Sequence, residues 1–418
     1  MIYKKQQFGT FNLHTIKTDK FKLCHVEIYF RNNVNVNDIT KRNALFDVLF
    51  ENNNEFKSRR LLNLKLEELY NAGIYCSNSK VGNAFVTSCD IDFISPKYTE
   101  KGIVKDSIKL LFDMIFNPNV NNNEFDNKTV ELVKKRIRDD INSIKESPAK
   151  QAIVGAKENL KDTPTAYTSL GSLDDIDAIT PESLYEYYEK VLASDYIDIF
   201  VIGDLDMEEV TKYILQYAKF DVIKTHKVDL YTPDLSVKTK FRSAKFTSAQ
   251  SNIVMLLRLN DLSDYEKKYV ANLYNMILGG GSLQTKLSKK LRQDNSLCYT
   301  VNSSYNKYDN VIVVKTAVDI NCVDKAIKLI KECLKDMVKD VSEDELSQAK
   351  ELINTSLNMN KDDLFRIVDN YYFQDISDLD ELDVRLKTFK EVKIDDIYKF
   401  AKKVDVATTF VLEGEENE

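Results

Sequence analysis

The sequence predicts an α+β protein built from two similar α/β domains in tandem. Its 418 residues exceed what one hydrophobic core usually organises. Strand-like runs lie next to amphipathic helix patterns in both halves. The same order of elements also recurs at an offset of about 220 to 230 residues, which indicates an internal duplication. We expect each domain to be a sheet covered by helices.

The repeated unit begins with the end of a helix and two strand-like runs. Residues 64–92, LKLEELYNAGIYCSNSKVGNAFVTSCDID, provide these elements in the first half, and residues 287–320 provide them in the second. A helix follows in each half, at 106–116 and at 325–337, and then a further helix, at 123–144 and at 342–359.

Helix signals support these assignments. In the segment 123–144, apolar residues recur at steps of three and four, which is typical of a helix with one apolar face: Val130, Val133, Ile137, Ile141 and Ile144. Ser342 and Glu345 form a capping-box pattern that marks the start of the segment 342–359.

The first half closes with a helix and a strand. Thr180 is an N-cap candidate, with Pro181 at the first helical position. The apolar run that ends at Gly203 lacks strict alternation, so we expect a strand covered on both faces.

The segment around Pro233 has no sustained helical period and is the best linker candidate. We therefore expect an N-terminal domain at 1–220, a linker at 221–242 and a C-terminal domain at 243–418.

Composition excludes several function classes. A net charge of −7 argues against nucleic acid or an anionic membrane as a bulk electrostatic partner. The N-terminus lacks an apolar run of signal-peptide length, and no membrane-spanning run of about 18 apolar residues occurs. We expect a cytoplasmic protein. Its six cysteines form no CxxC pair, and its three histidines lack the helical spacing of metal ligands.

Three of the eleven glycines stand together as Gly279, Gly280 and Gly281. The following residues do not complete a P-loop or a dinucleotide-binding loop, so a phosphate cradle is not supported. Two interpretations remain: a flexible turn between helices, or a backbone surface that another peptide can approach closely.

Arg292 and Tyr299 follow this glycine run. Leu283, Leu287 and Leu291 predict the buried stripe of a helix that ends at Arg292. Beyond it, strict alternation predicts a strand with Tyr299 on the same face as its neighbours two residues away. The Arg and Tyr side chains either converge at the helix-to-strand corner or are a surface Arg and a half-buried strand Tyr.

The chain resembles the insulinase/pitrilysin family of zinc peptidases (inverzincins), whose relatives include the mitochondrial processing peptidase. The segment GGGSLQTKLSKKLRQDNSLCYTV is similar to the family's glycine-rich loop and Arg/Tyr element, and the resemblance covers nearly the whole chain. It implies a metallohydrolase-like fold forming half of a clam-like chamber. Arg292 and Tyr299 would bind the scissile peptide and stabilise its oxyanion, and the three glycines would contact substrate.

The sequence departs from the family where the metal should be. Active members carry HxxEH, with two His ligands and a Glu base. The matching segment KRNALFDVLFENN places Asn43 and Asp47 at the ligand positions and Phe46 at the base position. The family's third ligand, a Glu, falls near Asp139 or Asp140. We therefore expect no metal in this chain, and zinc only in a partner subunit.

The loss of HxxEH beside an intact Arg/Tyr pair resembles the presumed-inactive members of this family, found beside a paralogue that keeps the motif. It implies a heterodimer in which this chain supplies Arg292 and Tyr299 to a peptide substrate held by an HxxEH-bearing paralogue. The alternative is a catalytically inactive peptide-binding or scaffold protein in a protein-modification or peptide-maturation pathway. A structural homodimer is a third possibility.

Overall fold

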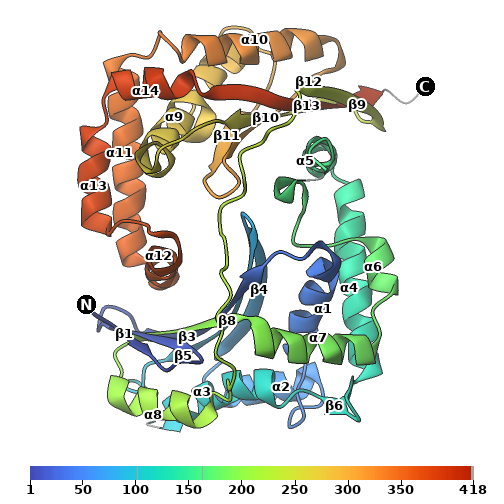
Figure 1. The fold of residues 1–418 in the computed structure, drawn as a ribbon, viewed down its shortest axis with the longest axis vertical. Helices are drawn as coiled ribbons and strands as arrows, with labels where there is room; N and C mark the ends of the chain where they lie inside the picture. Colours follow the sequence, from blue (N-terminus) through green and yellow to red (C-terminus); the bar gives the residue numbers. More distant parts are fainter. Residues whose placement is uncertain (101, 162, 416–418) are drawn as a thin grey trace. The chain divides into compact units, whose positions relative to one another are not determined.

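The computed structural model describes residues 1–100, 102–161 and 163–415 (Figure 1). Their contacts divide the chain into two compact units. Unit 1 comprises residues 1–141, 168–229 and 364–372, and unit 2 comprises residues 142–167, 230–363 and 373–418.

Unit 1 contains a six-stranded sheet in the order β1-β2-β8-β3-β5-β4. Strands β2 and β8 are parallel, and the other neighbours are antiparallel. The strands are β1 (Ile2–Gln7), β2 (Asn12–Lys17), β3 (Leu23–Asn33), β4 (Gly73–Val81), β5 (Ala84–Ile94) and β8 (Tyr196–Gly203).

The helices of unit 1 bury one face of this sheet in a single apolar core. They are α1 (Ile39–Leu49), α2 (Arg59–Glu68), α3 (Gly102–Phe116), α4 (Asn127–Lys145), α6 (Leu173–Asp177), α7 (Pro181–Ser194) and α8 (Met207–Tyr217). A short hairpin, β6 (Val120–Asn121) and β7 (Glu124–Phe125), lies between α3 and α4.

Two local predictions for this unit are confirmed. The Thr180 side chain accepts from the Ser183 amide at the start of α7, as an N-cap does. All residues of β8 after Tyr196 are buried, so this strand is covered on both faces, as its lack of strict alternation indicated.

Unit 2 contains a five-stranded sheet in the order β11-β12-β10-β13-β9. Its strands are β9 (Lys240–Thr247), β10 (Gln250–Leu259), β11 (Val301–Asn306), β12 (Val311–Asp319) and β13 (Val404–Glu415). Here β9 and β13 are parallel, and the other neighbours are antiparallel.

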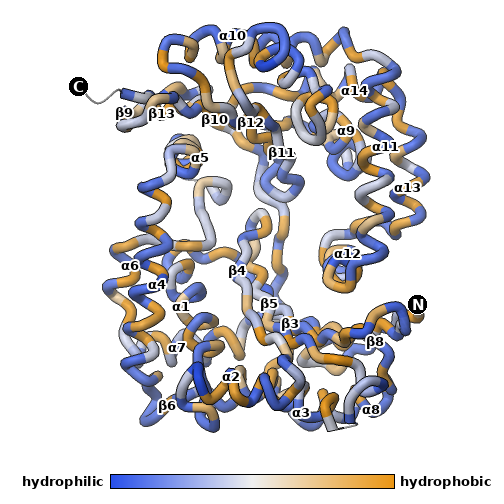
Figure 2. Tube along the Cα trace, turned by 180° about the vertical axis from the view of Figure 1, so that it is seen from behind, coloured by the Kyte–Doolittle hydropathy of each residue, from blue (hydrophilic) through white to orange (hydrophobic). Residues whose placement is uncertain are grey.

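Helices cover both faces of the unit 2 sheet. One face packs on α9 (Ala271–Asn275), α10 (Val323–Asp336), α11 (Glu343–Met359) and α14 (Ile394–Ala401), with α13 (Leu382–Glu391) alongside. The other face packs on α5 (Pro148–Glu158), where Gly155 lets the helix lie against the Phe410 ring. Hydrophilic and hydrophobic segments alternate along α10 in Figure 2, consistent with its single buried side. The capping box predicted for Ser342 and Glu345 is present at the start of α11.

The two sheets share one topology. The order β2-β8-β3-β5-β4 in unit 1 matches the order β9-β13-β10-β12-β11 in unit 2, including the parallel pair at the same end. The expectation of two similar α/β domains is thereby confirmed. The equivalence also makes α1 of unit 1 the counterpart of the helical segment 266–280 of unit 2, because each lies between the matching strands β3 and β4 or β10 and β11.

Residues 218–239 form neither helix nor strand and appear as an extended yellow-green segment in Figure 1, and the predicted linker 221–242 overlaps this segment. The last three residues of the predicted range 221–242 begin β9. Helix α4, whose residues 142–145 belong to unit 2, and helix α12 (Leu364–Ser377) are each divided between the units. No helix within the described part of the chain is long and apolar enough to cross a membrane.

Candidate functional site

The glycine run lies at the end of a helix in unit 2. Residues Met276–Gly280 form a π-helical turn, and Gly281 ends it. Gly279, Gly280 and Gly281 all have negative φ, so positive φ is not what requires glycine here. The requirement is space, because a Cβ on Gly279 would lie 2.7 Å from Leu287 Cδ1 and 3.0 Å from the Ser303 nitrogen. The glycine backbone therefore packs directly on the edge strand β11.

The segment after the glycines is helical, but only from Lys286 onward. Leu287 and Leu291 are fully buried as predicted, whereas Leu283 is 59% exposed. The prediction of a three-leucine buried stripe was wrong at Leu283, because that residue belongs to a turn that precedes the helix. The last turn is π-helical, from Ser288 to Gln293, a distortion that is frequent at functional sites.

Tyr299 lies in the loop before β11 and not inside a strand. The predicted alternation fails because β11 begins only at Val301, so Leu297 and Cys298 are both buried while Tyr299 is 79% exposed. A regular two-residue period requires extended backbone, which this corner lacks. The half-buried strand Tyr is thus excluded.

Arg292 and Tyr299 nevertheless converge. The guanidinium carbon of Arg292 lies 5.1 Å from the centroid of the Tyr299 ring, which is a cation–π contact. Together with the glycine run they line a cavity of about 250 Å³. Its wall is completed by Ser282, Leu283, Ser288, Thr300, Val301 and Asn302. The glycine run and the Arg/Tyr pair, which are separate in the sequence, therefore line the same cavity.

The equivalent place in unit 1 is α1, where the family motif would lie. Asn43, Phe46 and Asp47 stand on this helix, and Phe46 is buried in the core with 1% exposure. A phenyl ring cannot accept a proton, so this position lacks a general base. The Asn43 side chain accepts a weak hydrogen bond of 3.4 Å from Asn78 of β4.

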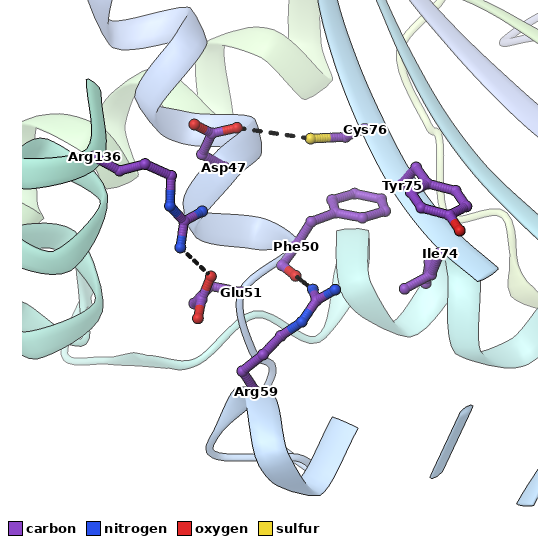
Figure 3. A pocket seen from close by; sticks show the side chains of 8 residues that line it. All are labelled: Asp47, Phe50, Glu51, Arg59, Ile74, Tyr75, Cys76 and Arg136. Carbon is purple, nitrogen blue, oxygen red and sulfur yellow. Dashed lines mark hydrogen bonds and ion pairs between the residues drawn. The ribbon is translucent and has the colours of Figure 1, made fainter. Parts of the chain in front are cut away.

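A pocket of about 350 Å³ opens beside Asp47 (Figure 3). Arg136 of α4 reaches into it and forms an ion pair of 2.9 Å with Glu51. Burial raises the pKa of the Asp47 carboxyl to about 6, while the nearby Arg136 charge opposes that rise. Sequence reasoning missed Arg136. Its one distinguishing feature in the sequence is its position one turn before Asp140. Asp139 and Asp140, the candidate positions of the family's third ligand, are both exposed.

The residues around this pocket do not fit a zinc ion. Zinc sites need three or four ligands from His, Cys thiolate or carboxylate. The pocket offers two carboxyls, Asp47 and Glu51, and Glu51 is already paired with Arg136. Burial raises the pKa of the Cys76 thiol, 4.0 Å from Asp47, and keeps this thiol protonated. The Arg136 guanidinium pairs with Glu51 and lies near Asp47, so the pocket already contains a positive charge that would repel a metal cation.

A second polar cluster in unit 1 surrounds His25. Its Nδ1 lies 2.6 Å from Asp92 and its Nε2 lies 3.1 Å from Glu27. These carboxylates raise the pKa of His25 to about 10 against the effect of burial. Both ring nitrogens therefore carry protons, and the cluster is an internal ion network.

Comparison with known proteins agrees with this geometry. Residues 178–353 match the family described as the peptidase M16 inactive domain. This segment is similar to the M16 peptidases. The chain is 24% identical over 418 residues to the probable inactive metalloprotease YmfF of Bacillus subtilis, covering 99% of this chain and 98% of that protein.

Two further relatives extend the comparison. The uncharacterized zinc protease YmxG of the same bacterium is 22% identical over 261 residues, covering 60% of each chain. A crystal structure of a conserved protein from Enterococcus faecalis V583 superposes with a TM-score of 0.92 at 23% identity, covering 100% of this chain and 99% of that chain. The expected resemblance to presumed-inactive insulinase-family members is confirmed, and the superposition confirms the fold.

Proposed function

We propose that this chain is the non-zinc-binding subunit of a heterodimeric insulinase-type metallopeptidase in the cytoplasm. Its partner is an HxxEH-bearing paralogue, and its substrate is a peptide. Arg292 and Tyr299 hold the peptide and stabilise the oxyanion, and the glycine run contacts it. The single observation that carries this proposal is the shared cavity that these residues line.

The chemistry of that cavity suits the role. A guanidinium offers several N–H donors and Tyr299 offers a phenol O–H, and both can donate to an oxygen that gains negative charge. The glycine backbones let a second main chain approach without side-chain obstruction. This chain contributes no metal or base of its own, since Phe46 and the Arg136 pocket do not fit them. Those groups would come from the partner.

Relatives with different metal status make the partnership reasonable. Bacillus subtilis has both a probable inactive metalloprotease and uncharacterized zinc proteases of this kind. The test mixes this chain with the HxxEH paralogue encoded by the same genome and measures hydrolysis of a quenched fluorescent peptide library. We expect hydrolysis from the mixture, and a loss of about 10²- to 10³-fold with Arg292→Ala.

The Lys290→Ala variant is the matched control, because Lys290 lies on the same helix and is paired with Asp336 at 2.8 Å. It should hydrolyse as the wild type does. Unchanged hydrolysis by the Arg292→Ala mixture, with complex formation intact, would contradict the proposal.

A second candidate is a peptide-binding or scaffold protein without catalysis. The observation that favours it is the guanidinium of Arg136 in the pocket where the active family holds its metal. It predicts peptide binding to the cavity, and no hydrolysis with any HxxEH paralogue of the same genome.

A further inference from the structure

The charge balance of the Arg292 cavity points to a specific group on its ligand. The cavity wall contains one charged side chain, the guanidinium of Arg292, and is otherwise made of glycine backbone, hydroxyls, an amide and apolar groups. None of the described residues lines it with a carboxylate. A site with one positive charge and no counter-charge is suited to an anion.

Arg292 differs in this respect from the other cations of its own helix. Lys286 and Lys289 share Glu345, at 3.1 and 3.7 Å. Lys290 contacts Asp336 at 2.8 Å. Among the described residues, the Arg292 guanidinium has no ion pair and donates no hydrogen bond, and it lies over the Tyr299 ring. Nearby carboxylates thus pair with the lysines of this helix, whereas the Arg292 guanidinium remains available to a ligand.

The Tyr299 contact also orients the guanidinium. A guanidinium that lies over an aromatic ring keeps its N–H groups in its own plane, where they can bind a carboxylate in bidentate fashion. The helix end beside it is held by Gln293, whose side-chain nitrogen donates to the Leu283 carbonyl at 2.9 Å. The Arg292 guanidinium is therefore held in one orientation at the end of its helix, and its N–H groups are available to a ligand.

We propose that this cavity binds the free C-terminal carboxylate of a peptide. The inference rests on the proposed function. Hydrolysis adds water across the scissile bond, so the carbonyl carbon ends as the carboxylate of the N-terminal fragment and the nitrogen leaves as an amine. The group held by Arg292 as an oxyanion becomes that carboxylate, and the cavity retains the fragment. Peptides with a free C-terminus are then ligands of this chain without its partner.

The flanking surface fits a peptide end. Leu283 is exposed at the cavity wall, and Leu352 of α11 lies near Gly281 and is 38% exposed. These side chains offer apolar contact to the residues that precede the carboxylate. Ser282, Ser288, Thr300 and Asn302 offer hydrogen-bonding groups to the peptide main chain.

The test uses the full chain and fluorescence anisotropy. The probe is a mixture of N-terminally fluorescein-labelled heptapeptides with randomised residues that exclude Asp and Glu, prepared in two forms. One form ends in a free carboxylate and the other in a carboxamide. We expect the carboxylate form to bind about 10- to 100-fold more tightly, the range typical of a charge-assisted hydrogen bond. Arg292→Gln should abolish this preference, and Lys290→Gln should keep it.

Each alternative result overturns the inference and speaks separately about the proposed function. Equal binding of both forms, weakened equally by Arg292→Gln, means that Arg292 holds an internal peptide bond, and the proposed function stands. A preference for the carboxylate that persists in Arg292→Gln places the anion elsewhere. Absence of binding by either form also overturns the inference, and the two-chain hydrolysis test then decides the proposed function. Far-ultraviolet circular dichroism of the Arg292→Gln and Lys290→Gln variants checks that each is folded.

Discussion

The Arg292 guanidinium carbon lies 5.1 Å from the centroid of the Tyr299 ring, at the corner between a π-helical turn and β11. Under the proposed function, this contact gives Tyr299 two roles. Its ring positions the guanidinium, and its hydroxyl is available to substrate, because the side chain is 79% exposed. These two functions can be separated by substitution.

Tyr299→Phe keeps the ring and removes the hydroxyl, whereas Tyr299→Ala removes both. In the two-chain hydrolysis assay, Tyr299→Phe should lower kcat by about 10²-fold through loss of one donor. Tyr299→Ala should lower it further and also weaken peptide binding. The free energies of unfolding of both variants should lie within about 0.5 kcal/mol of the wild-type value, because the Tyr299 side chain is exposed. Wild-type hydrolysis by Tyr299→Phe would remove the hydroxyl from the mechanism.

Gly279→Ala should destabilise the chain by about 1 to 3 kcal/mol through overpacking. The added Cβ would lie 3.0 Å from the main-chain nitrogen of Ser303, which the sheet holds in place. Gly281→Ala is the control, because its Cβ would meet the flexible end of the Met276 side chain. We expect it to cost less than about 1 kcal/mol. Urea unfolding of both variants checks this, and equal costs would show that β11 yields to the methyl group.

Arg42 and Asp195 form a buried ion pair of 2.7 Å in unit 1, and each is at most 2% exposed. Arg42→Ala should cost about 3 to 5 kcal/mol, because it leaves the Asp195 charge buried without its partner. Arg138→Ala breaks an ion pair of the same length with Asp177 on the surface and should cost at most about 1 kcal/mol. Chemical denaturation measures both. Similar costs would mean that water replaces the lost guanidinium in the interior.

Asp47 should make stability depend on pH. Burial raises the pKa of its carboxyl from the ordinary 3.8 to about 6 in the folded chain, so the folded state binds this proton more tightly than the unfolded state. Protonation of Asp47 therefore stabilises the folded state. This stabilisation is complete below pH about 4 and is lost as the pH rises through about 6.

Asp47→Asn removes that titration. Compared with wild type, the variant should gain on the order of 2 kcal/mol in relative stability between pH 4 and pH 7. Thermal unfolding of both proteins across this range provides the measurement. Asp139→Asn is the control, because that carboxyl is exposed. A difference between Asp47→Asn and wild type that does not change with pH would mean that Arg136 holds Asp47 ionised throughout.

Much of the fold could be predicted from the sequence because the information is local and repeated. The capping residues Thr180 and Ser342 mark helix starts through bonds to amides only three residues away. The apolar period of α4 and the lack of strict alternation in β8 indicate which faces are buried. Repetition of these signals revealed the duplication, and the two matching sheet orders agree with it.

The sequence by itself therefore determined the two-domain α/β architecture, the loss of the base at Phe46, and the Arg/Tyr pair as the candidate site. The tertiary structure alone decided the exposure of Leu283 and Tyr299, because a turn and a loop interrupt the helical and strand periods on which sequence reasoning depends. It also decided that Arg136 lies beside Asp47, because the two residues are distant in sequence and meet only where α4 packs near α1. The tertiary structure also decided that the Arg292 guanidinium is free of a carboxylate partner among the described residues. Its helix lies where the carboxylates of α10 and α11 reach the lysines and do not reach the cavity.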